Sequence, residues 1–153
     1  MTRPHLLTLV LLGIAVASTP CEAKTTRIHV TAEVVQQTFT GDPTSLQLGD
    51  RRINNVDLFD ESHTKVGTGA GFCTIVNIPP LDTREECLLT AEFAEGQIMF
   101  GGVAPLAEIG AVARFGILGG TDDFRKARGD ATLVVTTSGI IDVTFDLDQP
   151  VWP

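Results

Sequence analysis

From residue 24 onward, the chain consists almost entirely of short runs of β-branched and aromatic residues, separated by Gly, Asp, Asn and Pro. Runs of this kind predict strands, and no stretch longer than a turn or two has the apolar spacing of an amphipathic helix. The eight predicted strands span residues 26–39, 51–60, 64–77, 86–94, 97–103, 110–118, 130–137 and 140–148. The sequence therefore predicts an all-β fold.

The segments between the predicted strands indicate how the strands connect. "EG" at 95–96 and "SG" at 138–139 are short enough for tight hairpins. "NIPPLDTRE" at 77–85 holds paired prolines, which cannot donate to a β-ladder, so we expect an exposed connection there. Eight short strands joined mostly by hairpins favour an antiparallel, lipocalin-like β-barrel, because closure leaves no raw sheet edge. A β-sandwich is the alternative architecture.

The first 23 residues have the three-part pattern of a secretory signal peptide: Arg3, an apolar run from Leu6 to Val16, and then small residues. The small-residue rule allows cleavage after Ala17 or after Ala23. The apolar run is shorter than the roughly 20 residues of a membrane-spanning helix, so we expect no membrane anchor. We predict a cleaved signal peptide at 1–23, a single domain at 24–153, and secretion to the periplasm or the extracellular space.

The cysteines fit an oxidising compartment. Cleavage after Ala23 removes Cys21 and leaves Cys73 and Cys87, an even number that suggests one disulfide. The two lie on consecutive predicted strands, and antiparallel neighbours bring such positions to bonding distance. A thiolate nucleophile would need a base beside it, and neither "GFCTIV" nor "EECLL" contains one. Pro20 directly before Cys21 argues against lipid modification of that cysteine.

Charge and ligand spacing exclude several classes of partner. The net charge of −8 is retained after signal-peptide removal, and it repels nucleic acid and anionic membranes. His29 and His63 have no Cys or His at zinc-ligand spacing. Asp142, Asp146 and Asp148 alternate on one strand face, which is not the spacing of a calcium loop. We therefore expect no metal site.

The stretch "GGTDDFRKARG" at 119–129 combines glycines, acids and bases between two predicted strands. It lacks the Gly-Lys-Ser/Thr ending of a phosphate loop and opens no predicted helix. Gly119 and Gly120 are instead typical of a bend where a strand leaves a barrel, and Phe124 of an apolar plug beneath it. The residues alone thus indicate a structural role.

The same stretch resembles the signature GGTGxFxxAxG of the allene oxide cyclase and dirigent barrel superfamily. The matching positions are Gly119, Gly120, Thr121, Phe124, Ala127 and Gly129, and Asp122 replaces a glycine. Further similar stretches follow in the family's order: "LGD" at 48–50, "DLFD" at 57–60, "KVGTGAGFCTIV" at 65–76, "CLLTAEFAEGQIMFGG" at 87–102 and "GILGGT" at 116–121. Secreted bacterial members look most similar. The resemblance covers residues 26–148 and implies an eight-stranded barrel with an apolar cavity, commonly assembled as a trimer.

The resemblance implies a function for that cavity. Enzymes of the superfamily steer cyclisation or coupling of hydrophobic small molecules by holding one conformer, so orientation rather than a strong nucleophile does the work. Our first hypothesis is a cofactor-free cyclase or isomerase that directs stereochemistry. The alternatives are a lipocalin-like carrier of a hydrophobic small molecule, and an extracellular structural or interaction protein with a filled barrel.

The site residues that we predict are one carboxylate and an apolar wall. Glu33, on the first strand, is the candidate catalytic group that would stabilise developing charge. The predicted pocket residues are Val56, Leu58, Phe93 and Phe115. Val56 occupies the position where the cyclase subgroup has an asparagine, and the chain has no tyrosine, which plant dirigent pockets use. The first strand fits equally well with Val34 or with Glu33 facing inward, because a one-residue shift exchanges its faces.

Overall fold

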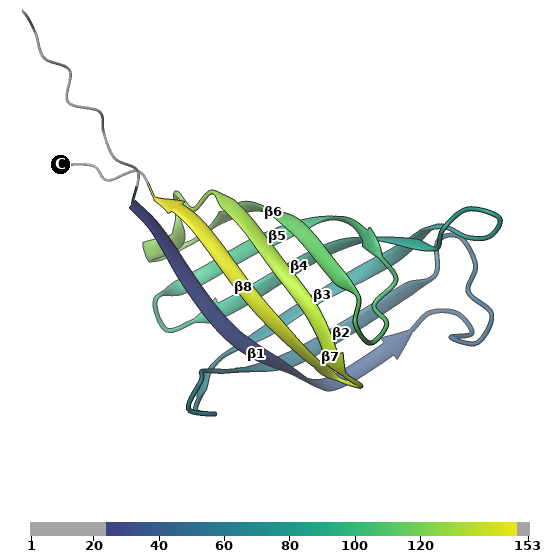
Figure 1. Ribbon diagram of the computed structural model, residues 1–153, viewed down its shortest axis with the longest axis horizontal. Helices are drawn as coiled ribbons and strands as arrows, with labels where there is room; N and C mark the ends of the chain where they lie inside the picture. The colour runs from purple at the N-terminus through teal and green to yellow at the C-terminus, as the bar shows by residue number, and fades with distance from the viewer. Residues whose placement is uncertain (1–23, 150–153) are drawn as a thin grey trace, which may run out of the picture.

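Residues 24–149 are described by the structure, a computed structural model. They form a closed antiparallel barrel in which each strand pairs with the next and β8 returns to β1 (Figure 1). The elements are β1 (Lys24–Phe39), β2 (Arg51–Phe59), β3 (Lys65–Asn77), β4 (Arg84–Phe93), β5 (Gly96–Pro105), β6 (Val112–Gly120), the 3₁₀ helix η1 (Asp122–Phe124), β7 (Gly129–Thr137) and β8 (Ile140–Gln149). The predicted barrel is confirmed and the sandwich alternative is wrong.

The strand ends lie within two residues of the predicted ones. Both predicted hairpins are present, and Gly96 and Gly139 adopt positive φ angles of 132° and 82°, which glycine tolerates best. The proline connection between β3 and β4 is exposed at Pro79, Pro80 and Leu81. The turn-forming residues between the strands therefore determine the strand boundaries.

The two ends of the barrel differ. Three connections, residues 40–50, 78–83 and 106–111, lie at one end together with the β7–β8 hairpin, and we call this the open end. The other end, which we call the closed end, carries η1 and both ends of the described chain (Figure 1). No helix among residues 24–149 is long and apolar enough to span a membrane. The predicted signal peptide and its cleavage points lie outside the described residues.

Phe124 on η1 fills the closed end. Its ring is buried and lies 6.0 Å from that of Phe93, which in turn meets Phe145 edge-on at 6.2 Å. The chain can fold back here because Gly120 has no side chain: a Cβ atom would overlap the carbonyl oxygens of Gln97 and Phe124. The prediction of a glycine bend above an apolar plug is confirmed.

The faces of β1 follow from burial. Val30 and Ala32 are each 3% exposed and point inward, so Glu33 between Ala32 and Val34 points outward. A β-bulge between Val34 and Gln36 then inserts one residue against β2. After the bulge, odd-numbered residues such as Gln37 line the interior.

Candidate functional site

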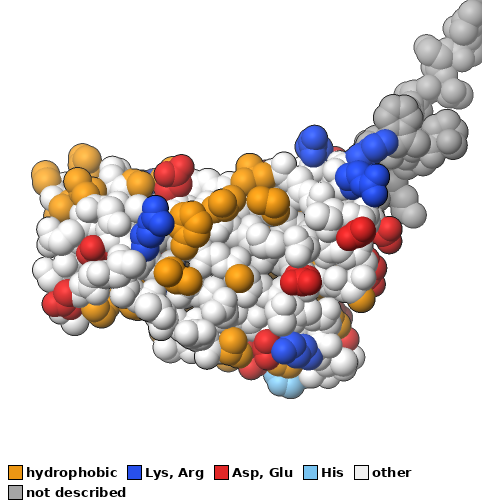
Figure 2. All heavy atoms as spheres, turned by 180° about the vertical axis from the view of Figure 1, so that it is seen from behind, with side chains coloured by type: hydrophobic (Ala, Val, Ile, Leu, Met, Phe, Trp, Pro, Cys, Tyr) orange, Lys and Arg blue, Asp and Glu red, His pale blue; other side chains and the backbone are white. Residues whose placement is uncertain are grey.

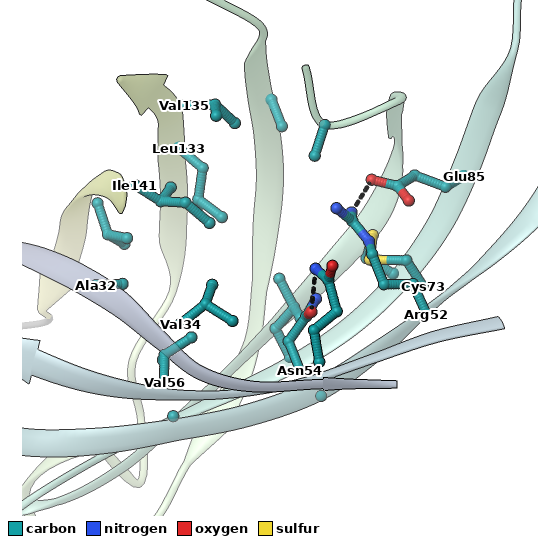
Figure 3. Close-up of a pocket in the computed structure, with 18 of the residues that line it drawn as sticks. Ala32, Val34, Arg52, Asn54, Val56, Cys73, Glu85, Leu133, Val135 and Ile141 are labelled. Atoms are coloured by element: carbon teal, nitrogen blue, oxygen red, sulfur yellow. Dashed lines mark hydrogen bonds and ion pairs between the residues drawn. A yellow bond between two sulfur atoms is a disulfide. The ribbon is translucent and has the colours of Figure 1, made fainter. Parts of the chain in front are cut away.

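A cavity of about 540 Å³ occupies the barrel between the packed closed end and the open end. This volume lies within the range of small-molecule sites. Much of its wall is aliphatic, including Ala32, Val34, Val56, Leu133, Val135 and Ile141. Figure 3 shows these side chains on one side of the cavity and Arg52, Glu85 and Cys73 on the other. The cavity thus has an apolar side and a polar side.

The structure places the predicted pocket residues in two regions. Val56, Leu58 and Phe115 line the cavity. Phe93 is not part of the wall, and its ring packs against Phe124 and Phe145 at the closed end. The expectation for Phe93 is therefore wrong, because the residue lies at the closed-end terminus of β4, beneath the cavity.

Glu33 lies on the outer face of the barrel. Its side chain is 36% exposed, and its Oε1 lies 3.9 Å from Nε2 of His63. The expectation that Glu33 faces the cavity is wrong, because the alternation of β1 turns Ala32 and Val34 inward. Two other carboxylates do line the cavity, those of Glu85 and Glu108, and of these Glu85 is buried.

The predicted disulfide is present. Cys73 on β3 and Cys87 on β4 are directly paired in the ladder, with an S–S distance of 2.05 Å. Both residues are buried, and both line the cavity. Glu85 lies near the two sulfur atoms, but these bond to each other and are not available as thiolate ligands for a metal.

Strand register brings Arg52 and Glu85 together beside the disulfide. Arg52 on β2 pairs with Cys73, and Glu85 precedes Cys87 by two positions, so all four side chains share the inner face. The Nη2 atom of Arg52 donates a hydrogen bond to Oε1 of Glu85 at 2.5 Å. The side chains are 15% and 3% exposed, respectively. The pair is therefore a buried ion pair in the cavity wall (Figure 3).

Burial and pairing act on Glu85 in opposite directions. Burial raises the pKa of the Glu85 carboxyl, while the charge and hydrogen bond of Arg52 and the amide of Ala107 offset only part of that shift. Within the described chain, Nε of Arg52 and Oε2 of Glu85 are buried without a hydrogen-bond partner. The pair is thus held by one hydrogen bond rather than by a bidentate contact.

A second polar pair lies in the same cavity. Nε2 of Gln37 donates to Oδ1 of Asn54 at 2.9 Å, and both residues line the wall. The residues that line the cavity include no histidine, tyrosine or lysine. The wall therefore offers orientation and local electrostatics rather than an activated nucleophile with its base.

Sequence reasoning missed both members of the ion pair. Glu85 lies one residue before the predicted fourth strand, which begins at residue 86. Its spacing of two from Cys87 was the available signal, since it places both residues on one face. Arg52 gave no comparable signal, because its partner is on another strand.

Comparison with known families and structures supports the same fold. The family model for the allene oxide cyclase barrel-like domain matches residues 25–146. No curated protein sequence matches the chain.

Solved structures with similar barrels include the following three. A pyocyanin demethylase has a TM-score of 0.69 at 22% identity, over 79% of this chain and 99% of that one. AbnU, an exo-specific intermolecular Diels-Alderase, has a TM-score of 0.69 at 14% identity, over 81% and 98%. The Diels-Alderase AbmU from Streptomyces koyangensis has a TM-score of 0.65 at 17% identity, over 86% of this chain and 72% of that one. At these identities, the likeness shows a shared fold.

Proposed function

Because the chain belongs to the allene oxide cyclase barrel-like family, we propose that it is a cofactor-free cyclase or isomerase for one hydrophobic small molecule. The observation that carries this proposal is the cavity of about 540 Å³, enclosed by the barrel and mostly apolar. The solved Diels-Alderases of similar fold support the same class of chemistry.

The shape of the cavity suggests how such a protein would act. An apolar molecule gains free energy by leaving water, and the packed closed end limits how deeply it enters. Arg52 and Glu85 lie opposite the aliphatic side, so a molecule with one polar end is bound in one orientation. Holding a single reactive conformer lowers the entropic part of the activation free energy. A charged pair in a wall shielded from water stabilises charge that develops in the transition state.

The second candidate function is a carrier that binds the same kind of molecule without changing it. It is favoured by one observation: the polar groups of the wall already pair with one another, as Arg52 with Glu85 and Gln37 with Asn54. A purely structural barrel is disfavoured, because its interior would be filled.

We propose that the mature protein, residues 24–153, is secreted through the signal peptide. Support comes from the disulfide, since such bonds persist in oxidising compartments. We also propose a homo-oligomer, a trimer as in related proteins. Hydrophobic side chains gather on the rear face of the barrel (Figure 2). Exposed apolar residues on β4, β5 and β6 are Leu88, Met99, Val103, Val112 and Leu118.

The test uses protein from residue 24 onward, incubated with a hydrophobic extract of the source organism and followed by chromatography with mass detection. Loss of one compound with the appearance of an isomer of equal mass is the expected result. Depletion with unchanged recovery after denaturation would establish the carrier instead. The matched control is Ala113→Phe, which fills the cavity from β6 and should abolish either effect.

A further inference from the structure

Arg52 is the one cationic residue in the cavity wall described by the structure. Its side chain retains 15% exposure, whereas that of Glu85 behind it retains 3%. A bound molecule would therefore meet the guanidinium rather than the carboxylate. The disulfide links β3 and β4 beside the ion pair, so the guanidinium lies next to a covalently braced part of the wall.

The hydrogen bonds of this guanidinium are incomplete. Arginine has five N–H donors, and within residues 24–149 only the bond from Nη2 to Glu85 is formed. The buried Nε of Arg52 and the buried Oε2 of Glu85 have no partner. Buried polar atoms normally have one, and leaving one unpaired costs stability. A cationic donor group left incompletely bonded beside a cavity is suited to accept an oxygen from a ligand.

The charge around Arg52 determines which oxygen is accepted. Glu85 neutralises the guanidinium at 2.5 Å, and Glu108 adds a second carboxylate to the wall. A ligand carboxylate would lose its hydration and meet no net positive charge. A carbonyl or ether oxygen loses less hydration and still accepts a charge-assisted hydrogen bond.

Building on the proposed function, we propose that Arg52 binds the carbonyl or ether oxygen of a neutral, otherwise apolar ligand, and that Glu85 is the positioning residue that holds Arg52 and excludes carboxylates. The ligand class is thus a ketone, enone or epoxide whose hydrocarbon part lies against the aliphatic side of the cavity. A hydrogen bond to such an oxygen also withdraws electron density from it, which activates a conjugated carbonyl or an epoxide for ring closure or rearrangement.

The experiment compares three probes of one skeleton, ethylnaphthalene, acetylnaphthalene and naphthoate, by equilibrium dialysis against the mature protein. We expect acetylnaphthalene to bind about tenfold more tightly than ethylnaphthalene, the value of one charge-assisted hydrogen bond. Naphthoate should bind more weakly than the ketone. Equal affinity for the ketone and the hydrocarbon would overturn the role of Arg52 and leave the proposed function standing.

Two variants separate recognition from structure. Glu85→Gln leaves the charge of Arg52 uncompensated, so the affinity for naphthoate relative to acetylnaphthalene should rise by about tenfold or more. A merely structural Glu85 would leave that ratio unchanged, which would overturn its assigned role. The double substitution Arg52→Met with Glu85→Met removes both charges together and should abolish the preference for the ketone while retaining ethylnaphthalene.

The matched control is Asn54→Leu, which alters the other polar pair of the cavity. It should leave the ratio between the ketone and the hydrocarbon within about twofold, and a larger loss would move the anchor from Arg52 to Asn54. If the double variant does not fold, two ratios still test the proposal: the affinity of the wild type for the ketone relative to the hydrocarbon, and the affinity of Glu85→Gln for naphthoate relative to the ketone. Failure of all three probes to bind the wild type would overturn the proposed function and this inference with it.

Discussion

At the closed end, the rings of Phe93, Phe124 and Phe145 fill the barrel, whereas at the open end the same eight strands enclose the cavity. Both ends use the inward-facing positions of the same ladder. At the closed end these positions carry aromatic rings that meet at 6.0 to 6.2 Å. Around the cavity they carry mostly aliphatic groups, a buried ion pair and the rings of Phe39, Phe100 and Phe115.

The comparison separates stability from function. Close packing of apolar groups stabilises a fold, while a cavity and an incompletely bonded ion pair both cost stability. The closed end therefore holds the barrel together, and the open end is free to bind. The disulfide braces the open end, where side-chain packing contributes less.

The largest effect is expected from removing the plug. Phe124→Ala should lower the free energy of unfolding by about 3–5 kcal/mol, because it deletes a buried ring and leaves a hole beneath β5 and β6. Leu106→Ala, at the partly exposed open end, should cost only about 1 kcal/mol. Denaturant unfolding of both variants measures the difference. Equal losses would show that the two ends contribute equally to stability.

A smaller decrease in the free energy of unfolding is expected from the double substitution Cys73→Ala with Cys87→Ala. The two cysteines are 14 positions apart, and opening such a loop costs about 3 kcal/mol in the chain-entropy model. Hydrogen exchange should rise first in β3 and β4 near the cavity and last around η1. Uniform faster exchange over the whole barrel would contradict a brace that acts on the open end.

The smallest effect concerns pH. Because burial raises the pKa of Glu85 in the folded state, the folded protein holds this proton longer than the unfolded chain does. The contribution of Glu85 to stability is therefore fully present below its ordinary pKa of 4.5 and is lost as pH rises through its higher folded value.

Glu85→Gln should remove this decline from a plot of unfolding free energy against pH. The matched substitution on the outer face is Glu33→Gln, which removes a carboxylate that does not line the cavity. A decline that persists in Glu85→Gln would show that Glu85 is not its source. Ligand binding should be insensitive to Glu33→Gln.

Predictions from the sequence succeeded where the signal was local. Strand ends agree because clusters of Gly, Pro and Asp between the β-branched runs favour turn geometry. The disulfide follows from two cysteines on consecutive antiparallel strands, and the plug from a phenylalanine just after two glycines. The two errors concern position in the barrel: Glu33 points outward, and Phe93 faces the interior but packs beneath the cavity.

The two errors have different causes. Phe93 lies at the closed-end terminus of β4, and a strand pattern does not say how deep along the barrel a residue lies. Alternation along a strand determines which residues share a face, but not which face is inside, and the bulge after Val34 changes the parity within β1 itself. Predicting the ion pair would have required the strand registers as well, since Arg52 and Glu85 lie on strands separated by β3 and meet only through the registers of two ladders.

The amino-acid sequence by itself thus determined the eight strands, their order and the disulfide, because β-propensity, turn chemistry and hairpin connection act over a few residues. Only the tertiary structure decided which carboxylate faces the interior, where the barrel is filled and where it stays hollow. Those properties depend on closure of β8 onto β1, which gives every strand an inside and an outside at once.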